Sequence, residues 1–151
     1  AMKSLAMSSE RYLRLLRESP AVHAADIYIT EIDKARLRSL VEVERGSEIF
    51  ELEHEIERAI VVDPWNVAED VVTMNSKALL QVDDEEREVA LVYPEDADER
   101  AGKLSVCSGI GTAILGYKAG DAFSWRIPNR TCHIRIEKVL YQPEAAGDFH
   151  L

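Results

Sequence analysis

The chain changes its hydrophobic periodicity once, at Asp63-Pro64, and this change constrains the fold more than any other feature. Before this point, apolar residues recur every three or four positions, which is typical of helices that bury one face. After it, short runs of β-branched and aromatic residues alternate with turn-forming or acidic residues, which is typical of strands. A chain with helices first and strands afterwards is expected to fold as an α+β protein.

The helical part predicts two antiparallel helices joined by a tight turn. Thr30 is placed to cap the first helix, with Asp33 at the N3 position as a variant of the capping box. The turn is Arg45-Gly46-Ser47, because Gly46 suits the left-handed position after a helix and Ser47 can cap the next one. The apolar side of the first helix consists of Ile32, Leu37, Leu40 and Val41.

In the second helix, apolar residues recur at a three-four-three spacing that forms a narrow seam, as in a coiled coil. The seam residues are Ile49, Leu52, Ile56 and Ala59. Asp63-Pro64 is expected to end this helix, because the residue before a proline disfavours the helical conformation.

Six runs after Trp65 are predicted to be strands of an antiparallel sheet. They are residues 71–74, 78–82, 88–93, 104–107, 122–127 and 132–141. One short helix interrupts them, with Ser108 as its cap and Gly116 as its end. The predicted organisation is therefore an amino-terminal extension at 1–25 with a possible short helix at 9–18, a helical hairpin at 26–63, and a sheet domain at 64–151.

Charge and composition exclude several classes of function. With 28 acidic against 18 basic residues, the net charge is −10, which argues against binding nucleic acid through its phosphates and favours a basic protein surface as partner. No sequence-specific DNA binding is expected. No apolar run reaches the roughly 18 residues of a membrane span. Cys107 and Cys132 fit neither a zinc motif nor a disulfide framework, so a cytoplasmic protein is expected.

Few residues suggest chemistry. Gly109 and Gly111 precede a helix, but the lysine and serine of a phosphate-binding loop are missing. Glu51 and His54 share a helix face without matching ligands elsewhere, so a solvated face is the simpler interpretation. We therefore predict no catalytic residue, no metal and no cofactor. Cys107 and Cys132 each lie in a predicted strand, where they are expected to be buried as small hydrophobic residues.

Several runs resemble one known family when they are taken together in this order. They are residues 70–76 (Asp-Val-Val-Thr-Met-Asn-Ser), 91–94 (Leu-Val-Tyr-Pro), 104–106 (Leu-Ser-Val), 113–116 (Ala-Ile-Leu-Gly), 119–121 (Ala-Gly-Asp) and 141–148 (Tyr-Gln-Pro-Glu-Ala-Ala-Gly-Asp). This set resembles the carboxy-terminal domain of the GreA/GreB transcript-cleavage factors, most closely their shorter Rnk branch. The resemblance extends over about residues 26–151. It implies an antiparallel coiled coil followed by a domain like that of the FK506-binding proteins (FKBP-like).

In that family, the carboxy-terminal domain docks on RNA polymerase while the coiled coil enters the secondary channel. The resemblance therefore implies the RNA polymerase core as partner. It places Ser108, Gly109, Ile110 and Gly111 at the docking surface. It places the hairpin tip in the channel, at Glu42, Glu44, Arg45, Gly46, Ser47 and Glu48.

The hairpin tip departs from the cleavage factors, which carry Gly-Asp-x-x-Glu there. Counting from Gly46, this chain has Ser47 and Phe50 at the two acidic positions. Glu48 and Glu51 have the right spacing, but a shift by one residue rotates them by about 100° around the helix. A first helix of about 14 residues also rises only ~21 Å. We therefore expect a regulator that occupies the channel, competes with Gre factors and does not stimulate cleavage.

Two alternatives remain. The first is a cleavage-competent Gre factor, in which Glu44, Glu48 or Glu51 would reach the catalytic metal. The second is a prolyl isomerase, which only the implied fold suggests. Its pocket would be lined by Trp65, Tyr93, Tyr117, Phe123, Trp125 and Tyr141.

Overall fold

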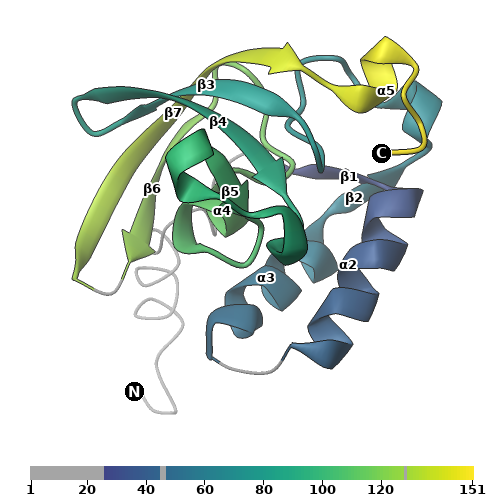
Figure 1. Cartoon of the computed structure of the whole chain (residues 1–151), viewed down its shortest axis with the longest axis horizontal. Coiled ribbons are helices and arrows are strands. Elements are labelled where there is room, and N and C mark those ends of the chain that lie inside the picture. The colour runs from purple at the N-terminus through teal and green to yellow at the C-terminus, as the bar shows by residue number, and fades with distance from the viewer. Residues whose placement is uncertain (1–25, 45–46, 128) are drawn as a thin grey trace, which may run out of the picture.

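The computed structural model describes residues 26–44, 47–127 and 129–151, and it has the mixed α+β architecture that the sequence predicts (Figure 1). The predicted helix at 9–18 lies outside these residues. The described helices and strands are β1 (Tyr28–Thr30), α2 (Glu31–Val43), α3 (Ser47–Arg58), β2 (Ile60–Val62), β3 (Lys77–Val82), β4 (Glu85–Val92), β5 (Lys103–Ser105), α4 (Gly109–Ile114), β6 (Ala122–Ile127), β7 (Arg130–Tyr141) and α5 (Pro143–Ala146). Three short 3-10 helices are η1 (Pro64–Asn66), η2 (Pro94–Asp96) and η3 (Glu99–Ala101).

The first predicted helix is confirmed as α2, and its start is the predicted one. The Thr30 side chain accepts a hydrogen bond from the Asp33 backbone N–H at 3.1 Å. The capping box is not completed, however, because the Asp33 carboxylate accepts from the Met74 N–H instead. Leu37 is fully buried, whereas Ile32 is 39% exposed. Only part of the predicted apolar side therefore faces the core.

The second predicted helix is confirmed as α3, and its residues Leu52 and Ile56 are buried in the core. The helix ends at Arg58, so the prediction that it continues to Asp63 is wrong. Residues 60–62 form β2 instead, because the β-branched run Ile-Val-Val suits a strand.

Strand β2 pairs in parallel with β1, a strand that the periodicity did not predict. Tyr28 lies opposite Ile60, and Thr30 lies opposite Val62. The two strands close the base of the hairpin formed by α2 and α3, which lie side by side in Figure 1. The base is tied to the rest of the chain, since the Tyr28 N–H donates to the Gly116 carbonyl at 3.1 Å.

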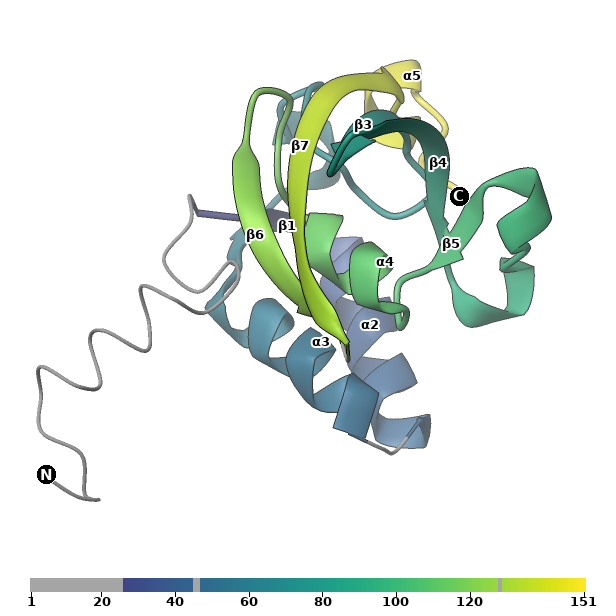
Figure 2. The same cartoon turned by 90° about the vertical axis from the view of Figure 1, so that its left-hand side faces the viewer.

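The large sheet has the strand order β5-β4-β3-β7-β6. Most neighbouring strands run antiparallel, as predicted, but β4 and β5 run parallel. The antiparallel prediction is wrong for this pair because the connection through η2 and η3 brings the chain back to Ala90, so that β5 runs beside the last residues of β4 in the same direction. The sheet curls around α4 in Figure 2.

Five of the six predicted strands are confirmed as β3 to β7, with ends that shift by up to three residues. The prediction for residues 71–74 is wrong. This run is buried but contains only an isolated bridge from Val71 to Lys118, followed by a turn at Asn75 with φ of 68°. Its valines reflect burial rather than strand pairing. The acidic residues Glu85 and Glu86 belong to β4.

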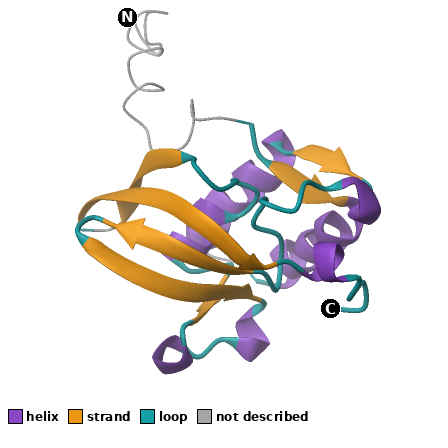
Figure 3. Ribbon diagram, turned by 90° about the horizontal axis from the view of Figure 1, so that it is seen from above, coloured by secondary structure: helices purple, strands orange, loops and turns teal. Residues whose placement is uncertain are grey.

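One continuous hydrophobic core joins the hairpin to the sheet. Leu37, Leu52 and Ile56 belong to the same buried cluster as Leu80 and Ile136 of the sheet. Seen from above, the large sheet and the β1–β2 pair lie on opposite sides of the molecule (Figure 3). Within the described residues, no helix is long and apolar enough to cross a bilayer.

Candidate functional site

The start of α4, where the predicted docking residues lie, is fixed by a local hydrogen-bond network. The Ser108 hydroxyl donates to the Ser105 carbonyl at 2.6 Å and accepts from the Gly111 N–H at 3.2 Å. The predicted N-cap is therefore confirmed. A Cβ added to Gly111 would lie 2.0 Å from the Ser105 carbonyl oxygen, so no other residue fits at this position.

The four predicted docking residues do not share one exposed face. Gly111 is buried, Ile110 is half-buried against the core, and Gly109 is exposed. Ser108 is half-buried and uses its hydroxyl within the cap. A partner that approached here would therefore meet the backbone around Gly109 rather than a set of protruding side chains.

The hairpin tip combines acidic and apolar side chains. Glu42 and Glu44 are exposed at the end of α2, and the Glu44 N–H donates to the Leu40 carbonyl at 2.9 Å. Val43 is 76% exposed and Phe50 is 72% exposed. Arg45 and Gly46 lie outside the described residues. Ser47 and Glu48 begin α3, but the structure does not describe their side chains.

A second group of polar residues, which periodicity did not reveal, connects α2 to residues 73–76. The buried Asp33 carboxylate accepts from the Met74 N–H at 3.0 Å. Burial, followed by the negative charge of Glu144, raises the pKa of Asp33 to about 7, while the Met74 hydrogen bond and Arg36 lower it. This carboxyl group can therefore exchange a proton near neutral pH.

The preceding residue of the same segment, Thr73, contacts α5. The Thr73 hydroxyl donates to the Glu144 carboxylate at 2.6 Å, and the Thr73 N–H donates to the Ser76 hydroxyl at 2.9 Å. Two carboxylates from different helices thus contact adjacent residues of one turn. The runs at 70–76 and 141–148 stand out in the sequence because they resemble the family. Their sequence does not show that they contact each other in the fold.

A third group connects α3 to the segment that follows α4. Glu55 is only 2% exposed and accepts from the Arg58 side chain at 3.0 Å. Arg58 also donates to the Tyr117 hydroxyl at 2.9 Å, and the Tyr117 ring stacks on Phe123 with centroids 4.2 Å apart. Burial raises the pKa of Glu55, and Arg58 opposes this effect. These contacts hold the hairpin against the sheet.

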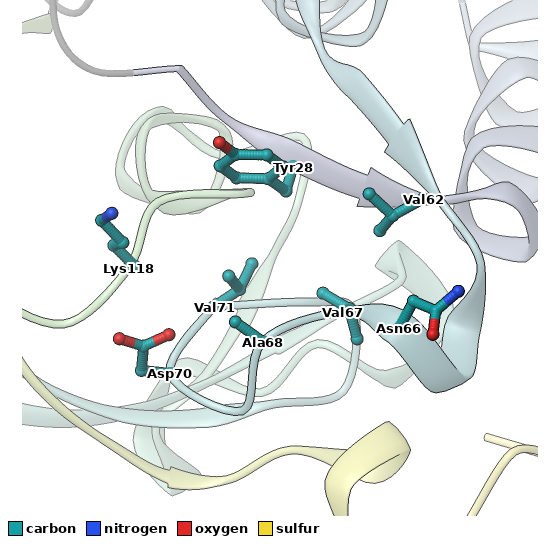
Figure 4. A pocket seen from close by; sticks show the side chains of 8 residues that line it. All are labelled: Tyr28, Val62, Asn66, Val67, Ala68, Asp70, Val71 and Lys118. Atoms are coloured by element: carbon teal, nitrogen blue, oxygen red, sulfur yellow. The ribbon is translucent and has the colours of Figure 1, made fainter.

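A cavity of about 380 Å³ lies between the hairpin base and the linker that follows it. Figure 4 shows the Tyr28 hydroxyl, the Asp70 carboxylate and the Lys118 ammonium group toward one end of the cavity. The apolar side chains of Val71 and Val67 lie further along it. The cavity could hold an amphipathic group. Its lining contains no nucleophile with an adjacent base.

The described residues offer little for catalysis. They contain no group of three or more His, Cys, Asp or Glu side chains that could hold a metal ion. Glu51 and His54 are both exposed on α3. Ser124 and His133 are 3.1 Å apart across neighbouring strands, but Asp83 accepts from the His133 backbone rather than from its ring. Among the residues that the structure describes, no third group therefore orients the imidazole as a catalytic base requires.

The aromatic residues of the isomerase alternative are dispersed. Tyr117 and Trp125 are buried in the core, whereas Trp65 is 72% exposed and contacts Phe149 at a different corner. They do not line one pocket.

Comparison with known families finds two matching stretches of the chain. Residues 67–141 match the family described as "Transcription elongation factor, GreA/GreB, C-term", and residues 26–62 match "Rnk N-terminus". The fold and these matches define the chain as a protein of the GreA/GreB class.

Individual relatives narrow the assignment. The chain is 37% identical over 131 residues to "Regulator of nucleoside diphosphate kinase" of Escherichia coli K12, covering 83% of this chain and 96% of the relative. A solved structure, "Prokaryotic transcription elongation factor GreA/GreB from Nitrosomonas europaea", is 38% identical with a TM-score of 0.65, covering 78% of this chain and 99% of that one. GreA of Thermodesulfovibrio yellowstonii is 31% identical over 62% of this chain and 61% of its own length. The chain belongs to the Rnk branch of the GreA/GreB family.

Proposed function

We propose that this protein binds the RNA polymerase core, places its hairpin in the secondary channel and competes there with Gre factors without stimulating transcript cleavage. Membership of the GreA/GreB family supports polymerase as the partner. In this proposal the sheet domain is FKBP-like and docks on the rim of the channel. An effect on nucleoside diphosphate kinase would then arise through transcription rather than through contact with the kinase.

The observation that carries the noncatalytic part is the chemistry of the hairpin tip. Phe50 occupies a position that is acidic in the cleavage factors, and its ring is 72% exposed. With Val43, it supplies an apolar surface that cannot hold a metal ion. Glu42 lies in the last turn of α2 and Glu44 follows its last residue, so both come before the turn, whereas the acidic residues of the family motif follow it.

The length of the hairpin supports the same conclusion. Helices α2 and α3 contain 13 and 12 residues. At 1.5 Å per residue, each rises only about 20 Å. A tip that extends so short a distance from its base would stop before the catalytic metal of the polymerase.

Co-purification with core polymerase tests the first part of the proposal. The full chain is the right reagent, because the hairpin and the sheet share one core and a fragment would lose buried contacts. We expect a stable complex that an excess of a Gre factor displaces. Failure to bind at micromolar concentration would remove the basis of the proposal.

A cleavage assay on stalled elongation complexes tests the second part. Saturating protein should leave the backtracked RNA intact, and an excess should slow cleavage by a genuine Gre factor. The alternative, a cleavage-competent factor, predicts Mg²⁺-dependent shortening that Glu44→Ala, Glu48→Ala or Glu51→Ala abolishes.

A further inference from the structure

A patch of exposed apolar side chains gathers where η1, the carboxy-terminal tail and the start of α2 meet. We call it the corner patch, and it consists of Ile32, Trp65, Phe149 and Leu151. The Trp65 and Phe149 rings meet edge to face, with centroids 6.3 Å apart. The Leu151 carbonyl accepts from Arg36 at 2.7 Å, and Ile32 lies one turn before Arg36 on the same helix face. Figure 1 shows the carboxy-terminus beside the start of α2.

The apolar side chains of the corner patch are exposed to solvent. Trp65 is 72% exposed, and Phe149 and Leu151 are each 42% exposed. Tryptophan contributes more to binding than most residues when a partner covers it, and contiguous exposed apolar side chains mark interaction sites. The corner patch therefore has the composition of a docking surface.

Two carboxyl groups at the edge of the corner patch favour a positively charged segment as the group that covers it. Glu31 precedes Ile32, and Asp63 lies two residues before Trp65. A hydrogen bond with Asp63, together with its negative charge, raises the pKa of Glu31. None of the ion pairs among the described residues involves either group. An arginine beside them would relieve their repulsion, and its guanidinium could also stack on the Trp65 ring.

The chain itself contains a segment with this chemistry. Residues 1–25 carry four basic against two acidic side chains, whereas the whole chain has a net charge of −10. Within 9–18, Leu13 and Leu16 are three positions apart, and the basic residues are Arg11, Arg14 and Arg17. The segment therefore combines apolar groups for the aromatic rings with arginines for the acidic edge.

The connection is long enough for this segment to reach the corner patch. Residues 19–25 can span about 23 Å when extended. The described chain begins at residue 26, two residues before β1. Because β1 and β2 are parallel, the extension enters at the Tyr28 end, and Trp65 follows Val62 at the other end, about 7 Å along the strands and three residues further.

We propose that residues 9–18 dock on the corner patch of the same chain, with Leu13 and Leu16 against Trp65 and Phe149 and the arginines beside Glu31 and Asp63. This contact would cover the apolar surface and connect the extension to both the hairpin base and the carboxy-terminal tail. It does not depend on polymerase binding.

Quenching of tryptophan fluorescence by acrylamide tests the proposal on the full chain. Trp125 is only 2% exposed, so the fluorescence that acrylamide quenches comes from Trp65. The variant Trp65→Phe removes this signal and so shows which part of the emission belongs to Trp65. Leu13→Asp with Leu16→Asp should steepen the quenching and shift the emission to longer wavelength. Leu5→Asp, in the same extension but outside the docking segment, is the matched control and should leave both unchanged. The double variant Glu31→Gln with Asp63→Asn should also leave Trp65 less shielded, so that its quenching becomes steeper and its emission shifts to longer wavelength.

Unchanged quenching in the Leu13/Leu16 variant would overturn the proposal. A dilution series tests whether the segment acts within its own chain. Shielding that persists on dilution supports the proposal, whereas shielding that disappears would assign the contact to a second copy and overturn it. Circular dichroism of the Glu31/Asp63 variant should remain that of the parent, because both residues lie outside the buried core.

Discussion

The carboxylate of Asp33 accepts a hydrogen bond from the backbone N–H of Met74 at 3.0 Å, although the two residues are 41 positions apart. Asp33 is 3% exposed at the start of α2, and Met74 lies in the turn that precedes β3. This bond connects the hairpin directly to the sheet. It also places an ionisable group in a position where its protonation state affects how firmly the two parts are held.

The stability of the protein should therefore depend on the pH through Asp33. Its folded pKa of about 7 lies above the ordinary value of 3.8, so between these values the folded state holds a proton that the unfolded state has lost. This contribution to the free energy of unfolding is greatest near pH 4 and is lost as the pH rises through about 7. Its size is at most about 4 kcal/mol.

Asp33→Asn isolates this contribution, because the amide is neutral and its oxygen can still accept from Met74. We expect the variant to equal the parent near pH 4 and to exceed it in stability at pH 8, as measured by urea denaturation across the pH range. A variant that is less stable than the parent at pH 8 would mean that the ionised carboxylate is favourable.

Ile56→Asp should disrupt the pairing of α2 and α3. Ile56 is 1% exposed in the common core, so the substitution buries a carboxylate without a partner and should cost at least about 3 kcal/mol. Glu57→Gln is the neighbouring control. It removes only the exposed Arg38–Glu57 pair between the two helices and should cost less than about 1 kcal/mol. Equal thermal stability of the two variants would contradict the position of Ile56 in the seam.

Gly111→Ala should destabilise the start of α4 far more than a glycine replacement elsewhere. The added Cβ would lie 2.0 Å from the Ser105 carbonyl oxygen, so the cap must open, at a cost of at least about 3 kcal/mol. At Gly120, where φ is +95° and no heavy atom lies within 4 Å, alanine should cost only the conformational strain of about 1 to 2 kcal/mol. Chemical denaturation of both variants ranks the two effects.

Phe50→Ser tests the proposed role of the hairpin tip in competition with Gre factors. Because the ring is 72% exposed, its loss should leave the thermal stability nearly unchanged. We expect the variant to remain bound to core polymerase but to need a higher concentration to inhibit Gre-dependent cleavage. Full inhibition at the parent concentration would show that the apolar tip has no part in the competition.

Features that depend on neighbouring residues could be predicted from the sequence. The caps at Thr30 and Ser108 each involve a residue three positions away, and Gly116 adopts the predicted left-handed conformation with φ of 83°. Turn chemistry and apolar spacing are sufficient for such elements. Helices α2 and α3 and most strands follow from the same local signals.

Features that depend on distant residues could not be predicted in this way. β1 and β2 are three-residue strands separated by the whole hairpin, and neither shows periodicity on its own. Residues 71–74 have strand composition but make their hydrogen bonds irregularly, with Val72 donating to Tyr117 and Asn75 donating to Leu91. The Asp33 contact also needs the tertiary fold, because a carboxylate at N3 ordinarily suggests a local cap.

The parallel pairing of β1 and β2 has a mechanical consequence for the hairpin. Helix α2 leaves the pair beside Thr30 and Val62, whereas α3 returns beside Tyr28 and Ile60, at the opposite end. The two attachment points are therefore separated by two residues along the strands, or about 7 Å. Two separated anchors resist twisting better than a single hinge does. The hairpin should behave as a stiff lever, so that a small rotation of its base is transmitted to the position of the tip.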